Sequence, residues 1–207
     1  CKRMSEAAKK EGVDLQITQE PIADTAAMNE LLDECSKSPP DGIILTVMSL
    51  NAGWKETNRF VAERPADIPT IVFSPMGTSF TGHLQPTRNQ PKTLVAATQD
   101  LDWLAEGVHL LKTNFDMKTS RLLIVNGDET EDKVLDVIGT TLRYIPLVRW
   151  EEELKAIGDT AEMKQLAAEL AQRAKAIREP GEQDVFKAAK NYFVAKKLMA
   201  DERCDGI

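Results

Sequence analysis

The sequence is poor in the side chains that most often build catalytic and metal centres, with two histidines and three cysteines among 207 residues. Cys1, Cys35 and Cys204 are far apart and show no CxxC or Cys/His spacing of the kind that binds zinc. We interpret them as reduced, packed thiols from a cytoplasmic-type compartment.

Several recognisable motifs are also missing from the sequence. It contains no GxGxxG, GxxxxGK[ST] or GxSxG, so nothing in it indicates nucleotide binding or serine-hydrolase chemistry. No apolar run reaches the ~20 residues that cross a bilayer, and no secretion leader is evident. The net charge of -7, with basic residues scattered among carboxylates, argues against nucleic acid or an anionic membrane as a partner.

What the sequence does contain is a soluble α/β pattern, with 42% hydrophobic and 29% charged residues. Short apolar runs typical of buried parallel strands alternate with amphipathic helical stretches. Strands are predicted at 13–17, 43–48, 69–73, 122–125 and 142–146. Helices are predicted at 2–11, from Asp24 or Thr25, from about 54 to 61, 97–117, about 128–138, and in three stretches ending with one from Asp184.

This alternation predicts doubly wound, mostly parallel sheets with helices on both faces, arranged as two consecutive α/β domains. The domains are expected at 1–118 and 119–207, the second incomplete at its C-terminal end. Cys1 opens directly into a helical pattern, and 204–207 is where another strand should begin. Both ends of the sequence are therefore interpreted as cropped.

Ligands of such folds bind beyond the carboxyl ends of the strands, which directs attention to the loops 49–54, 74–92 and 126–130. His83 follows Gly82 in a long Gly/Thr loop, and its ring either faces a ligand or caps a backbone carbonyl. Trp54 either stacks on the apolar face of a sugar ring or packs in the core. His109 lies among acidic residues on the polar side of a helix and is interpreted as a surface histidine.

The order of these segments resembles the L-fucose isomerase family and the wider fucose/arabinose isomerase group. The likeness lies in element order over nearly the whole chain and not in a signature motif. Three stretches carry it. The first is Asp41-Gly42-Ile43-Ile44-Leu45-Thr46-Val47 with the helix from Trp54, and the second is Ile71-Val72-Phe73 with the loop to Gly82-His83. The third runs from Leu123 through Val125-Asn126-Gly127 to Trp150-Glu151-Glu152-Glu153-Leu154, and its helices end in Ala188-Ala189 and Lys196-Lys197-Leu198.

The resemblance implies a metal-dependent aldose–ketose isomerase that moves a proton between C1 and C2 of a monosaccharide, with manganese polarising the oxygens. The family's metal-binding Glu, Asp and His fall downstream of Ile207, so this segment is expected to bind no metal itself. The family is oligomeric, and its first domain lends an aromatic residue to a neighbouring subunit's active site. This sequence departs from that pattern, with Asn51 near that point and Trp54 three residues on.

The resemblance therefore assigns substrate contacts to three residues of this segment: Asn51, Trp54 and His83. Asn51 and His83 would bind sugar hydroxyls, and Trp54 would pack against the carbon skeleton. A non-catalytic sugar-binding protein of the periplasmic-binding type, which also pairs two α/β lobes, is the alternative. A family member retained only for structure or assembly is a third possibility.

Overall fold

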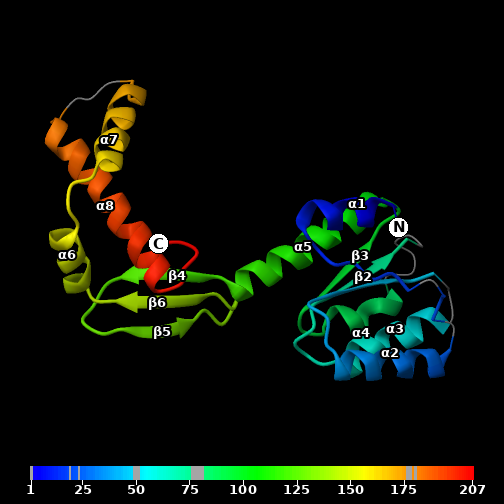
Figure 1. The fold of residues 1–207 in the computed structure, drawn as a ribbon. Helices are drawn as coiled ribbons and strands as arrows, with labels where there is room; N and C mark the ends of the chain where they lie inside the picture. Colours follow the sequence, from blue (N-terminus) through cyan, green and yellow to red (C-terminus); the bar gives the residue numbers. More distant parts are fainter. Residues whose placement is uncertain are drawn as a thin grey trace. The chain divides into compact units, whose positions relative to one another are not determined.

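The computed structural model describes residues 2–18, 20–22, 24–48, 52–75, 82–175, 179 and 181–207. It shows a mixed α/β protein with two small, mostly parallel sheets (Figure 1). The chain divides into two compact units, Cys1–Phe115 and Asp116–Ile207, a few residues before the boundary predicted at 118/119. None of the described helices is both long enough and apolar enough to span a bilayer.

Unit 1 is built on a three-stranded parallel sheet in the order β1-β2-β3. The strands are β1 (Ile43–Thr46), β2 (Thr70–Ser74) and β3 (Thr93–Ala97). The helices are α1 (Lys2–Glu11), α2 (Thr25–Lys37), α3 (Ala52–Glu63), α4 (Gln85–Arg88) and α5 (Asp102–Thr119), whose residues from Asp116 on belong to unit 2. Asp24 caps α2 by accepting from the backbone N–H of Ala27 at 2.9 Å, as its sequence position predicts.

Two sequence-based assignments in unit 1 are wrong. β3 was not predicted, because residues 93–96 were left between the predicted loop 74–92 and the helix predicted from Ala97, which itself begins only at Asp102. The predicted strand at 13–17 is not paired in the sheet. Its residues do alternate between half-buried and exposed, but such a pattern specifies only which side chains face the protein and does not supply a hydrogen-bonding partner.

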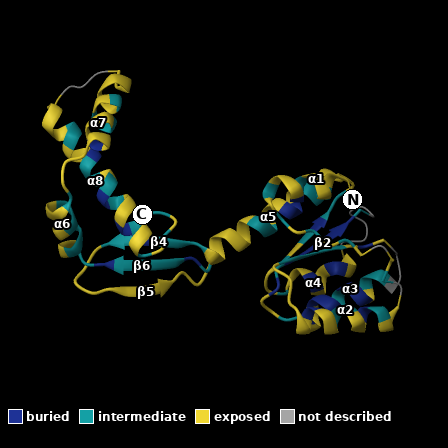
Figure 2. Cartoon of the chain, viewed as in Figure 1, coloured by how far each residue is buried: buried dark blue, intermediate teal, exposed yellow. Residues whose placement is uncertain are grey.

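Helices cover both faces of the unit 1 sheet, as the doubly wound pattern predicts. On one face, Val72 of β2 packs with Met28 of α2 and Phe60 of α3 in the main core cluster. On the other face α5 approaches closely: a Cβ added at Gly107 would lie 3.1 Å from Ile44 Cδ1. The central strand β2 is buried along its whole length between these layers and appears dark blue in Figure 2.

A buried arginine joins the end of α3 to the sheet. Arg64 is only 5% exposed, and its guanidinium donates to carbonyl and hydroxyl oxygens rather than to a carboxylate. Burial lowers the pKa of this guanidinium. The acceptors are the carbonyls of Val61, Ile68 (3.1 Å) and Pro91 (3.0 Å) and the hydroxyls of Thr70 (2.6 Å) and Thr93 (3.0 Å).

Replacing this arginine should destabilise unit 1. Arg64→Met keeps the aliphatic stem but leaves buried carbonyls without donors, so the free energy of unfolding should fall by about 1–3 kcal/mol. Arg3→Met is the control, because Arg3 pairs with Asp102 at the surface and exposed pairs contribute about 0–1 kcal/mol. Urea unfolding measures both, and equal effects of the two substitutions would contradict this role of Arg64.

Unit 2 has a three-stranded mixed sheet in the order β4-β6-β5. β4 (Arg121–Val125) and β6 (Thr141–Ile145) are parallel, and β5 (Glu131–Val134) is antiparallel to β6. Beyond β4, Gly206 forms a parallel bridge with Leu122, which is where the sequence predicts a further strand. The helices are α6 (Leu147–Ala156), α7 (Ala161–Arg173) and α8 (Glu182–Asp201).

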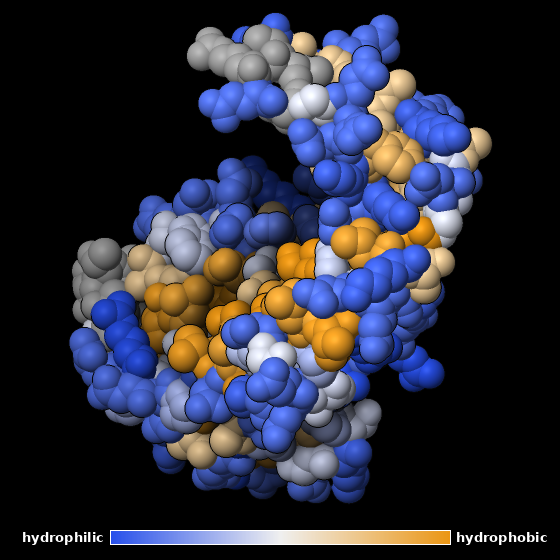
Figure 3. All heavy atoms as spheres, turned by 90° about the vertical axis from the view of Figure 1, so that its left-hand side faces the viewer, coloured by the Kyte–Doolittle hydropathy of each residue, from blue (hydrophilic) through white to orange (hydrophobic). Residues whose placement is uncertain are grey.

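The helix predicted at about 128–138 is wrong, because this segment forms β5 and the turn into β6. Val134 and Val137 are 59% and 95% exposed, so the apolar residues of the segment do not form a core-facing helical stripe. Gly139 has φ +78°, which suits the turn between the strands. Hydrophobic residues at the molecular surface are visible as orange spheres in Figure 3.

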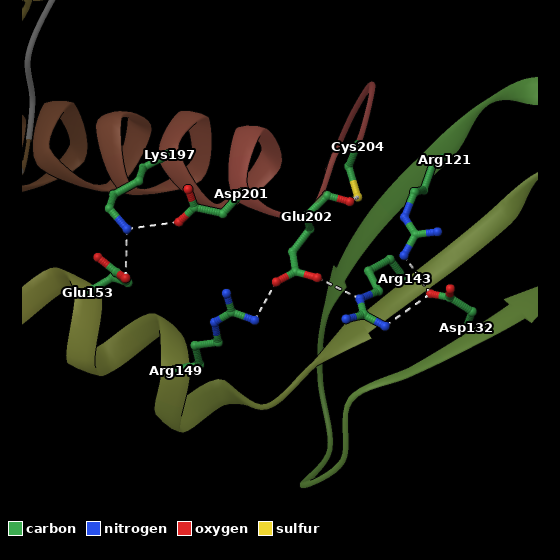
Figure 4. Close-up of polar contacts among 9 residues, drawn as sticks. All are labelled: Arg121, Asp132, Arg143, Arg149, Glu153, Lys197, Asp201, Glu202 and Cys204. Carbon is green, nitrogen blue, oxygen red and sulfur yellow. Dashed lines mark hydrogen bonds and ion pairs between the residues drawn. The ribbon is translucent and has the colours of Figure 1, made fainter.

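An ion-pair network closes the end of α8 onto the unit 2 sheet (Figure 4). The Glu202 side chain, 8% exposed, accepts from Arg143 Nε at 2.7 Å and pairs with Arg149. Asp132 of β5 in turn accepts from Arg143 at 3.3 Å and from Arg121 at 2.9 Å. Burial opposes ionisation of Glu202, but the hydrogen bonds from Arg143 and Arg149 outweigh it and lower the carboxyl pKa.

Removing the charge of Glu202 should destabilise unit 2 in a pH-dependent way. A carboxyl with a lowered folded-state pKa contributes stability above its unfolded pKa and loses it as pH falls. Glu202→Gln should therefore cost about 1–3 kcal/mol at neutral pH, and the difference from wild type should shrink below about pH 4. Chemical denaturation at several pH values measures this, with the exposed Glu151→Gln as control. A difference that grows toward acid would contradict the assignment.

Candidate functional site

The carboxyl edge of the unit 1 sheet carries two of the three predicted site residues. α3 follows β1, and Trp54 lies in its first turn. His83 lies in a short 3-10 turn at 82–84, just before α4, so the predicted loop 74–92 is partly helical. Asn51, the third predicted residue, lies outside the described residues.

Trp54 and His83 stack face to face at this edge. Their ring centroids are 4.0 Å apart and the ring planes differ by 3°. Trp54 is half-buried and packs against the main core cluster, whereas His83 is exposed. One face of the indole is therefore used by the imidazole, and Trp54 forms a platform on which His83 rests. Aromatic pairs of this kind contribute about 0.5–1.5 kcal/mol beyond the area they bury.

The backbone of His83 is held from the same helix. Asn58 Nδ2 donates to the His83 carbonyl at 2.8 Å, and Asn58 Oδ1 accepts from the Thr87 hydroxyl. Thr87 is fully buried. Neither Asn58 nor Thr87 was predicted from the sequence, although Asn58 follows Trp54 by four residues and so lies on the same face of α3. We refer to Trp54, Asn58, His83 and Thr87 as the Trp54–His83 site.

The chemistry available at the Trp54–His83 site is that of an exposed imidazole on an apolar support. A neutral imidazole offers one N–H donor and one nitrogen acceptor, which matches hydroxyl groups. Its ring face offers a flat apolar surface beside them. Such a surface is chemically complementary to a small molecule that combines hydroxyls with apolar C–H groups.

The site does not supply ligands for the manganese that the family resemblance implies. Its polar groups are an imidazole, an amide and a hydroxyl, whereas manganese favours carboxylate oxygens. Within the described ranges, no three His, Cys, Asp or Glu side chains are grouped so that they could hold a metal ion. No step of the chemistry is therefore assigned to a metal on these residues.

The second histidine belongs to a surface contact, as predicted. His109 on α5 is 57% exposed in its side chain, and its Nδ1 lies 3.4 Å from Glu11 Oε1 of α1. The structure thus separates the roles of the two histidines. His83 lies at the carboxyl edge of the sheet, and His109 joins two helices.

Comparison of the sequence with known protein families finds no matching family model, and comparison with curated proteins finds no match.

The stacking predicts a distinctive NMR signature for His83. A ring lying on an indole face has its protons shifted upfield by the indole ring current, so the two histidines of the chain should give well separated signals. Trp54→Leu should move the His83 ring signals downfield and leave those of His109 in place. Assignment by His109→Gln and a ¹H–¹³C spectrum of the histidine rings measure this. His83 signals that do not move would show that the rings are not stacked in solution.

Proposed function

We propose that this chain binds a monosaccharide at the Trp54–His83 site, as the N-terminal part of an aldose–ketose isomerase of the L-fucose isomerase type. The observation that carries the proposal is the exposed His83 ring, supported by Trp54 at the carboxyl edge of a parallel sheet. The proposed ligand-facing role of His83 is the one predicted from the sequence. Trp54 has a revised role as the platform below it.

A monosaccharide fits this site because it combines both kinds of group that an exposed imidazole can contact. Its hydroxyls exchange hydrogen bonds with the ring nitrogens, and its C–H groups pack against the ring face. Asn51 remains a proposed hydroxyl contact, although it lies outside the described residues. Monosaccharide binding is therefore supported by chemical complementarity at Trp54 and His83, together with the family resemblance.

The isomerase part of the proposal rests on the resemblance. In such enzymes a divalent metal such as manganese polarises the sugar oxygens while a proton moves between C1 and C2. The residues of this chain would instead bind and orient the sugar. We also propose that the protein is a cytoplasmic homo-oligomer and that it has no nucleic-acid partner.

A second candidate is a non-catalytic sugar-binding protein. The division into two compact α/β units favours it as much as it favours the isomerase, because binding proteins of the periplasmic type also pair two such lobes. The two candidates share the Trp54–His83 site and differ in turnover. Conversion of L-fucose or L-arabinose to its ketose by the full-length protein in the presence of manganese distinguishes them.

Sugar binding should depend on His83. Titration calorimetry with L-fucose and L-arabinose should show saturable binding, and His83→Ala should weaken it about tenfold, the loss expected for one hydrogen bond and its packing. His109→Ala is the matched control and should bind as wild type does. Equal affinity of the His83 and His109 variants, or no binding of any pentose or deoxyhexose, would contradict the proposal.

A further inference from the structure

We infer that Asn58 is a positioning residue that sets the orientation of the His83 ring. The inference deepens the proposed function, but its structural part can be tested without any ligand. It rests on the two contacts of the Asn58 amide and on the place of Asn58 in α3.

The histidine is held at two points that come from one helix. Trp54 contacts the ring, with centroids 4.0 Å apart, and Asn58 holds the backbone carbonyl at 2.8 Å. Because these two residues are one turn apart on α3, they keep a fixed spacing. The ring and the carbonyl of His83 are thus both held by the same rigid helix, α3.

The neighbours of His83 in the chain show why this second point is needed. Leu84 is fully buried in the core cluster and fixes the chain on one side. Gly82 on the other side has open space where a Cβ would be, so no side chain fixes the chain there. The hydrogen bond from Asn58 to the His83 carbonyl supplies the missing constraint.

An amide is the side chain that this position requires. Asn58 donates to the His83 carbonyl and accepts from the Thr87 hydroxyl at the same time. Aspartate can only accept, and leucine can do neither. Asn58→Asp therefore keeps the size of the side chain and the bond from Thr87, while it removes the one donor that faces His83.

A ring already held in place loses less freedom when a ligand binds. Ordering a free side chain at an interface costs about 0.5–1.5 kcal/mol, which corresponds to about a two- to tenfold loss of affinity. Asn58→Asp should therefore weaken sugar binding by about this factor, although Asn58 need not touch the sugar.

The experiment compares three variants of the 207-residue chain by the ring signals of its two histidines. Asn58→Asp should shift the His83 signals toward those of an unstacked ring and leave those of His109 unchanged. Asn89→Asp is the matched control, because it adds the same charge at an exposed position just after α4 and should change neither set. Thr87→Val removes the other bond of the amide and should give a smaller shift in the same direction.

The outcomes separate this inference from the proposed function. His83 signals that shift in Asn58→Asp and not in Asn89→Asp support the positioning role, whether or not a sugar binds. Signals that stay in place in both Asn58→Asp and Thr87→Val overturn it. If they shift and L-fucose titration shows weaker binding for Asn58→Asp than for Asn89→Asp, the positioning role extends to the ligand. If wild type binds no sugar, the proposed function fails, and the ring signals alone decide the role of Asn58.

Discussion

The candidate site depends on how firmly α3 is fixed to the parallel sheet of unit 1. At the C-terminal end of this helix, the Arg64 guanidinium is buried among carbonyl and hydroxyl oxygens that belong to α3 itself and to the segments leading into β2 and β3. A cation at a helix C-terminus also interacts favourably with the helix dipole. Along its length, Phe60 and Val61 anchor the helix in the core. The first turn therefore presents Trp54 at a defined place on the opposite edge of the sheet.

In unit 2 the end of a helix is likewise fixed to the sheet, but by an ion pair between oppositely charged side chains. There a carboxylate, Glu202, lies just after α8 and is held by arginines from β6 and α6. Such a pair is sensitive to protonation of the carboxylate, whereas the bonds of Arg64 to uncharged acceptors are not. The Glu202 network is thus expected to weaken as pH falls, whereas the contacts of Arg64 are not.

The sequence predicted the elements whose patterns are unambiguous. Buried apolar runs located β1, β2, β4 and β6, and capping by Asp24 located α2. It failed where two patterns overlap or where a pattern lacks a partner, as at β3, at 13–17 and at 128–138. Gly139 illustrates this limit of sequence-based prediction, because a glycine indicates a turn between strands only when the neighbouring strands are known to pair.

The candidate site was predicted in part, for a related physical reason. The rule that parallel strands share a carboxyl edge brought Trp54 and His83 into one region. It could not show that one ring lies on the other, because stacking depends on the backbone path into His83, where Gly82 has open space in place of a side chain. Asn58 and Thr87 were not predicted because their role depends on the hydrogen bond between them, and the sequence does not show which amide and which hydroxyl lie close together.

The central claim is that His83, supported by Trp54, is the surface that a sugar contacts. Intermolecular NOE spectroscopy of the uniformly ¹³C-labelled chain with L-fucose tests it most directly. The account predicts NOEs between the His83 ring protons and sugar C–H protons, with none to His109. Bound L-fucose with NOEs to other residues and none to His83 would contradict it.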